Sequence, residues 1–171
     1  TKVVLSIDCR QEVFDMLENN GIRTVTSKVG DYNVVNTSRK ENASFSAERS
    51  GHYCFYAFSN NSDGIYASAE LSRAKPGELF EFSTQFKNVT LFDKFLGRVD
   101  FSKLEGEIEK ENPRALTTLD GVKAVFDEYM LLIRASTTEP KVRINSEAAT
   151  RTLARKGIEK AKALISNARA E

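Results

Sequence analysis

The sequence has few of the residues that build disulfide frameworks or metal clusters, and its charges almost cancel. Its two cysteines, Cys9 and Cys54, lie far apart and belong to no metal-binding motif. We therefore expect reduced, buried thiols in a cytoplasmic protein, and no disulfide framework or metal site. Lysine and arginine number 25 against 24 aspartates and glutamates, which gives a formal net charge of +1. This balance does not favour binding to nucleic acid or to an acidic membrane surface.

Long hydrophobic runs are also missing. No stretch approaches the ~20 apolar residues that span a bilayer, and the chain does not begin with the basic and apolar regions of a signal peptide. Of the 171 residues, 40% are hydrophobic and 29% are charged, which is ordinary for a globular protein. This length allows one large domain or two small domains, each with its own core.

Strand and helix patterns alternate in the first part of the chain, which is typical of a layered α/β domain. A β-branched run opens it, Gly21 can end the first helix with a positive φ, and Asp31 and Asp63 are suitable N-caps. The patterns predict, in order, a strand at 2–7, a helix at 11–20, a strand at 23–27, a helix at 31–37, a loop at 38–44, strands at 45–47 and 53–58, and a helix at 64–73.

Pro76 and Gly77 interrupt this pattern, so we expect a linker or connecting helix at 76–87. The following patterns predict a strand at 89–99, a charged helix at 102–111, strands at 121–126, 129–135 and 142–146, and an amphipathic helix at 148–170. The predicted organisation is therefore an α/β domain at 1–75, a linker at 76–87 and a small α+β domain at 88–171.

Arginines and short alcohols cluster around one predicted turn in the second part. Arg134 ends an apolar strand, Ser136, Thr137 and Thr138 follow it, and Arg143 stands on the next strand. Guanidinium groups bind oxyanions in a bidentate way, and hydroxyls and free backbone N–H groups add short hydrogen bonds. This composition favours a phosphate-binding turn. A polar hairpin with scattered surface charge is the alternative, because such hairpins are common.

A second polar cluster separates two predicted strands in the first part. Glu48 and Ser50 are two positions apart, so in an extended segment their side chains point to the same side. Such a pair can hold neighbouring sugar hydroxyls, and Gly51 permits close approach of the backbone. His52 is the only histidine of the chain, and its ring can move a proton near neutral pH. A turn with a solvated glutamate is the alternative.

These clusters resemble motifs of the α-D-phosphohexomutases. The segment R-A-S-T-T-E-P-K-V-R at 134–143 resembles the phosphate-binding loop of the family's last domain, R-x-S-(N/G)-T-E-P followed by arginine, with Thr137 in place of asparagine or glycine. The segment E-R-S-G-H at 48–52 resembles the sugar-recognition loop E-x-S-G-H of the third domain. T-S-K-V-G-D at 26–31 is similar to a turn that helps select sugar orientation. D-G-I at 63–65 and D-G-V-K at 120–123 resemble structural turns.

The resemblance implies the later part of domain three followed by domain four, which is a TBP-like α+β domain. Enzymes of this family transfer phosphate from a phosphoserine through a bisphosphorylated sugar, with Mg²⁺ held by an aspartate-rich loop. We find neither a T-x-S-H loop nor a D-x-D-x-D cluster in this sequence. We therefore expect the chain to be cut inside domain three, with domains 1 and 2 missing. Alone it is predicted to be inactive and to bind no metal.

The resemblance also implies roles for individual residues. Arg134, Ser136, Thr137, Thr138 and Arg143 would hold the non-reacting phosphate. A second group would read the sugar, with hydroxyl contacts from two residues, a pocket shaped by two others and a candidate acid/base or positioning group: Glu48 and Ser50, Gly30 and Asp31, and His52. The leading hypothesis is a phosphomannomutase or phosphoglucomutase. A phosphoglucosamine mutase fragment and a non-catalytic phosphosugar-binding module are the alternatives.

Overall fold

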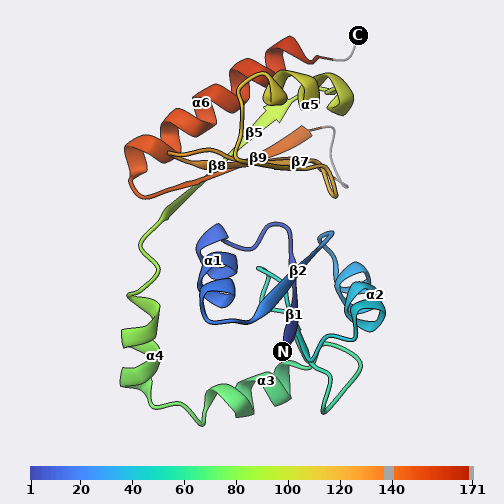
Figure 1. The fold of residues 1–171 in the computed structure, drawn as a ribbon, viewed down its shortest axis with the longest axis vertical. Helices are drawn as coiled ribbons and strands as arrows, with labels where there is room; N and C mark the ends of the chain where they lie inside the picture. The colour runs from blue at the N-terminus through green and yellow to red at the C-terminus, as the bar shows by residue number, and fades with distance from the viewer. Residues whose placement is uncertain (137–140, 170–171) are drawn as a thin grey trace. The chain divides into compact units, whose positions relative to one another are not determined.

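A computed structural model describes residues 1–136 and 141–169 of the chain (Figure 1). The chain divides into two compact units, Thr1–Lys87 and Asn88–Glu171. Both units combine strands with helices, which confirms the predicted mixed α/β and α+β fold class. No helix of the described residues is both long and apolar enough to cross a membrane.

The first unit has a four-stranded sheet of order β2-β1-β3-β4. β1 pairs in parallel with β2 and β3, and β4 is antiparallel to β3. The elements of this unit are β1 (Lys2–Ser6), α1 (Gln11–Asn19), β2 (Arg23–Ser27), α2 (Asp31–Glu41), β3 (Phe45–Ala47), β4 (Tyr53–Phe55), α3 (Gly64–Leu71) and α4 (Pro76–Ser83).

Helices α1 and α2 lie on opposite faces of this sheet (Figure 1), and alternate side chains of β1 pack against each of them. Val3 and Leu5 of β1 point to one face and pack with Phe14 of α1. Val4 points to the other face and packs with Val34 of α2. Because β1 is buried on both faces, its sequence is continuously apolar and does not alternate.

The helix predicted at 31–37 is longer than expected, and the loop predicted at 38–44 is wrong for its first part. α2 continues to Glu41, and Ser38 is buried within it. The Ser38 hydroxyl donates to the Val34 carbonyl oxygen at 2.8 Å, so this buried polar group has a partner. The N-cap is Gly30, and Asp31 is the first helical residue, not the cap. Asn42 ends the helix in the left-handed region, at φ +50°.

The second unit has an antiparallel sheet of order β5-β9-β8-β7-β6. Helices α5 and α6 cover one face of it (Figure 1), and the core between them includes Leu104, Leu131, Ile133, Ile144 and Ile165. The elements are β5 (Val89–Leu96), α5 (Phe101–Glu109), β6 (Ala115–Thr117), β7 (Val122–Val125), β8 (Met130–Ala135), β9 (Lys141–Ala148) and α6 (Arg151–Asn167).

α6 lies close to β9 because it carries a glycine at the contact. A Cβ at Gly157 would lie only 2.2 Å from Ser146 Oγ. The helix begins later than the predicted position 148, because Ala148 still pairs with Val89 in the sheet. Thr150 is the N-cap and accepts a hydrogen bond from the Leu153 N–H at 3.2 Å.

One further segment differs from the sequence prediction. Strand β6 was not predicted, since its three residues give too short a pattern to recognise. Residues 76–87, expected to form a linker or connecting helix, contain the helix α4, which has no buried residue. Cys9 and Cys54 are both buried, as predicted. Burial raises the pKa of the Cys54 thiol, which makes it a poor nucleophile.

Candidate functional site

The polar hairpin between β3 and β4 is closed by its own backbone. The Glu48 N–H donates to the His52 carbonyl oxygen at 2.9 Å, and the Gly51 N–H donates to the Glu48 carbonyl oxygen at 3.0 Å. Gly51 has φ +92°, a conformation that favours glycine. The hairpin therefore presents the side chains at 48, 50 and 52 on a short and defined turn.

The Glu48 carboxylate is buried, with a side chain only 4% exposed. Its Oε1 accepts a hydrogen bond from the Gly30 N–H at 2.7 Å, and its Oε2 lies 3.3 Å from His52 Nδ1. Burying a carboxylate is costly unless such partners are present. Gly30 is also the N-cap of α2, where the helix end favours negative charge.

The remaining predicted residues of the first unit lie around this carboxylate. Asp31 opens α2, and the Ser62 hydroxyl donates to its Oδ1 at 2.5 Å. Ser50 Oγ lies 3.0 Å from His52 Nδ1. Asp31, Ser50 and His52 are exposed to solvent. The structure thus brings together the five residues predicted from the sequence, and their acceptors and donors can bind neighbouring hydroxyl groups.

In the second unit, Arg134 on β8 and Arg143 on β9 are direct cross-strand partners. Directly opposite residues of an antiparallel pair point to the same face, with Cβ atoms ~4.5–5.5 Å apart. The Ser136 N–H donates to the Lys141 carbonyl oxygen at 2.9 Å and extends this pairing toward the turn. The predicted ligands Thr137 and Thr138 lie outside the described residues.

Asp120, on the turn before β7, holds the Arg134 guanidinium. Arg134 Nη2 lies 2.8 Å from Asp120 Oδ2, and the two side chains are 13% and 24% exposed. Gly121 brings this turn close, since a Cβ there would lie 2.2 Å from the Ile133 oxygen and 2.9 Å from Arg134 Cα. Arg134 Nε is buried without a hydrogen-bond partner among the described residues. One edge of the guanidinium is therefore fixed before any anion binds.

A third cation, which was not predicted from the sequence, lies beside Arg134 and Arg143. Lys94 on β5 is the cross-strand partner of Arg143, so Lys94, Arg143 and Arg134 form a row across three strands on one face. Lys94 and Arg143 are exposed. A hollow of about 370 Å³ adjoins them, and its lining residues are Phe92, Asp93, Lys94, Lys141 and Arg143. Its positive charge suits an anion.

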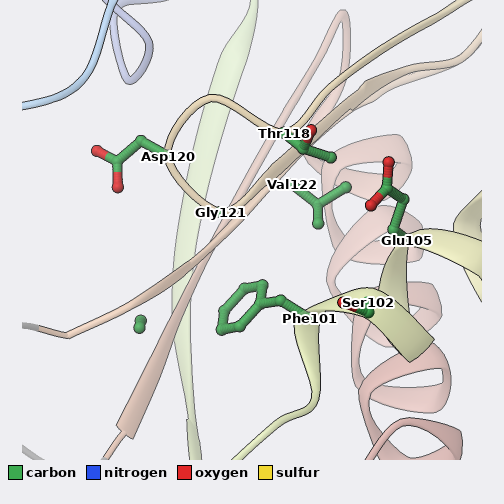
Figure 2. Close-up of a pocket in the computed structure, with 8 residues that line it drawn as sticks. Phe101, Ser102, Glu105, Thr118, Asp120, Gly121 and Val122 are labelled. Atoms are coloured by element: carbon green, nitrogen blue, oxygen red, sulfur yellow. The ribbon is translucent and has the colours of Figure 1, made fainter.

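A different hollow, of about 220 Å³, lies beside the turn that carries Asp120 (Figure 2). The Asp120 side chain points away from Thr118 and Val122. The hollow is lined by Phe101, Ser102, Glu105, Thr118, Asp120, Gly121, Val122 and Ala135. These include two carboxylates and no cation, so this hollow does not suit a phosphate group.

The first unit thus carries a hairpin of hydrogen-bonding side chains, and the second unit carries a row of cations on an antiparallel sheet. The model of the phosphoglucomutase/phosphomannomutase α/β/α domain III matches residues 1–77, and the model of the C-terminal domain matches residues 96–163. The chain therefore belongs to the phosphoglucomutase/phosphomannomutase family, which confirms the resemblance found in the sequence.

Individual relatives agree with this family. A probable phosphoglucosamine mutase of Methanocella arvoryzae is 35% identical over 156 residues, which cover 85% of this chain and 35% of the relative. A phosphoglucomutase/phosphomannomutase of Thermococcus kodakarensis is 29% identical over 85% of this chain and 33% of its own length. The chain thus spans about a third of these relatives.

Solved structures show the same fold. A phosphoglucomutase/phosphomannomutase family protein from Burkholderia thailandensis has a TM-score of 0.76 at 23% identity, over 98% of this chain and 38% of its own. An Aspergillus fumigatus N-acetylphosphoglucosamine mutase, solved with GlcNAc-6P and magnesium, has a TM-score of 0.65 at 12% identity, over 98% of this chain and 39% of its own.

Proposed function

We propose that this chain is the substrate-binding part of a phosphohexomutase, an isomerase that interconverts hexose 1-phosphate and hexose 6-phosphate. The observation that carries the proposal is the register that places Arg134 opposite Arg143. Like charges directly opposite on neighbouring strands are destabilising, whereas a bound phosphate dianion would turn this repulsion into attraction. Asp120 neutralises only one cation of the row.

The hairpin of the first unit would read the sugar. The Glu48 carboxylate accepts hydrogen bonds from hydroxyls, and Ser50 can both donate and accept. Gly30 fixes Glu48 through its N–H, while Asp31 borders the pocket from α2. His52 contacts Glu48 and Ser50. We therefore propose that it positions these two side chains, with proton transfer as the alternative role.

Phosphate transfer requires groups that we place outside this chain. A phosphoserine and a magnesium loop in the missing domains 1 and 2 would supply them, because transfer depends on in-line placement and charge neutralisation. Mg²⁺ prefers octahedral oxygen ligands, and the one group of three metal-binding side chains among the described residues includes the His52 imidazole. That group does not fit Mg²⁺, so no step is assigned to the ion here.

Several relatives are named phosphoglucosamine mutases, which favours an amino sugar as substrate. We therefore propose glucosamine phosphate first, with glucose and mannose phosphates as the alternatives. We also place the protein in the cytoplasm, where the buried thiols of Cys9 and Cys54 would stay reduced.

Kinetics of the full-length protein test this function. The enzyme should convert glucosamine 6-phosphate to glucosamine 1-phosphate with a higher kcat/KM than it shows for glucose or mannose phosphate. A higher value for glucose or mannose phosphate would reassign the sugar. Tight binding of hexose phosphates without turnover, in full-length protein loaded with Mg²⁺ and phosphorylated on serine, would instead establish a non-catalytic binding module.

A further inference from the structure

Three side chains with metal-binding atoms converge at the hairpin of the first unit. Asp31 begins α2, Glu48 follows β3 and His52 precedes β4, and one donor atom of each lies within 4.8 Å of the other two. The sequence analysis predicted no metal ligand in this chain. We propose that Asp31, Glu48 and His52 bind a divalent transition-metal ion of the Zn²⁺ type.

The buried Glu48 carboxylate is already oriented as a ligand. The Gly30 N–H fixes Oε1 at 2.7 Å, and Oε2 lies 3.3 Å from His52 Nδ1. Two ligands of a tetrahedral Zn²⁺, with bonds of ~2.0–2.1 Å, are about 3.4 Å apart. The oxygen and the nitrogen therefore have the spacing that a shared ion requires, and only the Ser50 hydroxyl, 3.0 Å from the same nitrogen, has to turn away.

The third ligand is oriented from outside the cluster. The Ser62 hydroxyl donates to Asp31 Oδ1 at 2.5 Å. Such outer hydrogen bonds orient metal ligands and raise the affinity of a site. The Asp31 carboxylate is exposed and already lies within 4.8 Å of the other two donor atoms. Its second oxygen can therefore bind an ion while the Ser62 bond to Oδ1 is kept.

Charge and ligand chemistry agree with this geometry. Two carboxylates within 4.8 Å of each other repel when both are ionised, and a dication removes this repulsion. The imidazole determines the type of ion. Mg²⁺ and Ca²⁺ prefer oxygen ligands, whereas imidazole with carboxylates suits Zn²⁺ and its neighbours. Three protein ligands leave a further position for water.

One consequence rests on the proposed function. Glu48 Oε2 would serve either the ion or a sugar hydroxyl, so the ion would exclude the sugar from the hairpin. The metal site itself is independent of the phosphate-binding row in the second unit. Its test therefore uses metal ions alone, and its failure would leave the proposed hexose phosphate binding unaffected.

Titration of this chain with Co²⁺, followed by visible absorption and then displacement by Zn²⁺, tests the site. We expect saturation at one equivalent, with the strong visible bands of Co²⁺ in a tetrahedral environment. Asp31→Asn, His52→Gln and Glu48→Gln should each weaken Co²⁺ binding by at least about tenfold. Asp15→Asn, on the exposed side of α1, is the matched control and should bind as the wild type does.

The variants also separate metal binding from folding. Asp31 and His52 are exposed, so both variants should keep the wild-type circular dichroism spectrum and Tm, even where Glu48→Gln does not. A wild-type chain without saturable Co²⁺ bands would overturn the proposal. Bands that persist unchanged in both Asp31→Asn and His52→Gln would overturn it too. They would show that Glu48 and His52 form only an ion pair, with Asp31 nearby, and bind no metal ion.

Discussion

Arg134 and Arg143 lie directly opposite each other on β8 and β9, and only Arg134 has an ion-pair partner among the described residues. Asp120 supplies that partner from the preceding turn, at 2.8 Å. On the other side of Arg143, Lys94 adds a further positive charge. Like charges directly opposite on neighbouring strands are destabilising, and the phosphate proposed as ligand would remove this repulsion.

Arg143→Gln should therefore stabilise the chain in the absence of anions. Removing one of two opposed like charges should raise the free energy of unfolding by about 0.2–1 kcal/mol. Urea denaturation in a buffer without phosphate or sulfate measures this change. Arg98→Gln, in the exposed loop after β5, is the control and should change stability by less than about 0.5 kcal/mol. A loss of stability in Arg143→Gln would contradict the prediction.

The Arg134–Asp120 pair should show strong coupling in a double-mutant cycle. Arg134→Ala removes a largely buried side chain and takes away the guanidinium that forms an ion pair with Asp120. We expect each single variant, Arg134→Ala and Asp120→Ala, to lose about 1–3 kcal/mol of unfolding free energy. The double variant should lose less than the sum, because the ion pair can be lost only once. Additive losses would show that the pair contributes little.

Gly121→Ala should be strongly destabilising. Gly121 has φ +78°, and its Cβ would lie 2.2 Å from the Ile133 oxygen. Backbone strain and displacement of the turn should together cost about 3 kcal/mol or more. Gly106→Ala is the matched control, because a Cβ at this position in α5 meets nothing within 4 Å. It should stabilise the chain by about 0.5–1 kcal/mol. Thermal unfolding of both variants compares the two effects.

Asp93 should give the second unit a pH-dependent stability. Hydrogen bonding from Lys162, at 2.6 Å, lowers the pKa of the Asp93 carboxyl. A lowered pKa in the folded state contributes stability above the unfolded value of ~3.9, and this contribution is lost as the pH falls through the folded value. Asp93→Asn should cost about 0.5 kcal/mol at neutral pH, since both side chains are partly exposed.

Urea denaturation of this variant at several pH values measures that contribution. The difference between wild type and Asp93→Asn should shrink toward zero as the pH falls below the folded pKa. Lys162→Gln should reproduce the loss at neutral pH, because it removes the same hydrogen bond. A difference that is constant over the whole range would show that Asp93 contributes through something other than its charge.

Local patterns were sufficient to predict most elements of this fold. The β-branched opening gave β1, and the Asp63 N-cap of α3 accepts the Tyr66 N–H at 2.8 Å as a cap should. The end of α2 could not be predicted, because the polar residues after Thr37 read as a loop. In the structure Ser38 is buried within the helix, and its hydroxyl donates to the Val34 carbonyl oxygen. Side-chain bonds of this kind depend on which face is buried, and propensity does not contain that information.

Some residues of the candidate site could also be predicted from the sequence, and others could not. Arg134 and Arg143 lie on β8 and β9, which are consecutive in the chain and pair antiparallel, so the sequence could indicate that they are neighbours. Lys94 comes from β5, which is distant in sequence from β9, and its register depends on the whole sheet. Asp120 was interpreted as part of a structural turn. Its contact with Arg134 follows from the pairing of β7 with β8, which places Val122 opposite Ile133.

Binding of hexose phosphate by the full-length protein tests the central claim most directly. Isothermal titration with glucosamine 6-phosphate should give a dissociation constant for Arg143→Gln that is higher than the wild-type value by about 10-fold to 100-fold. Loss of a charge-assisted contact of about 1.5–3 kcal/mol predicts this factor. Equal dissociation constants for wild type and Arg143→Gln would contradict the assignment of this row as the phosphate receptor.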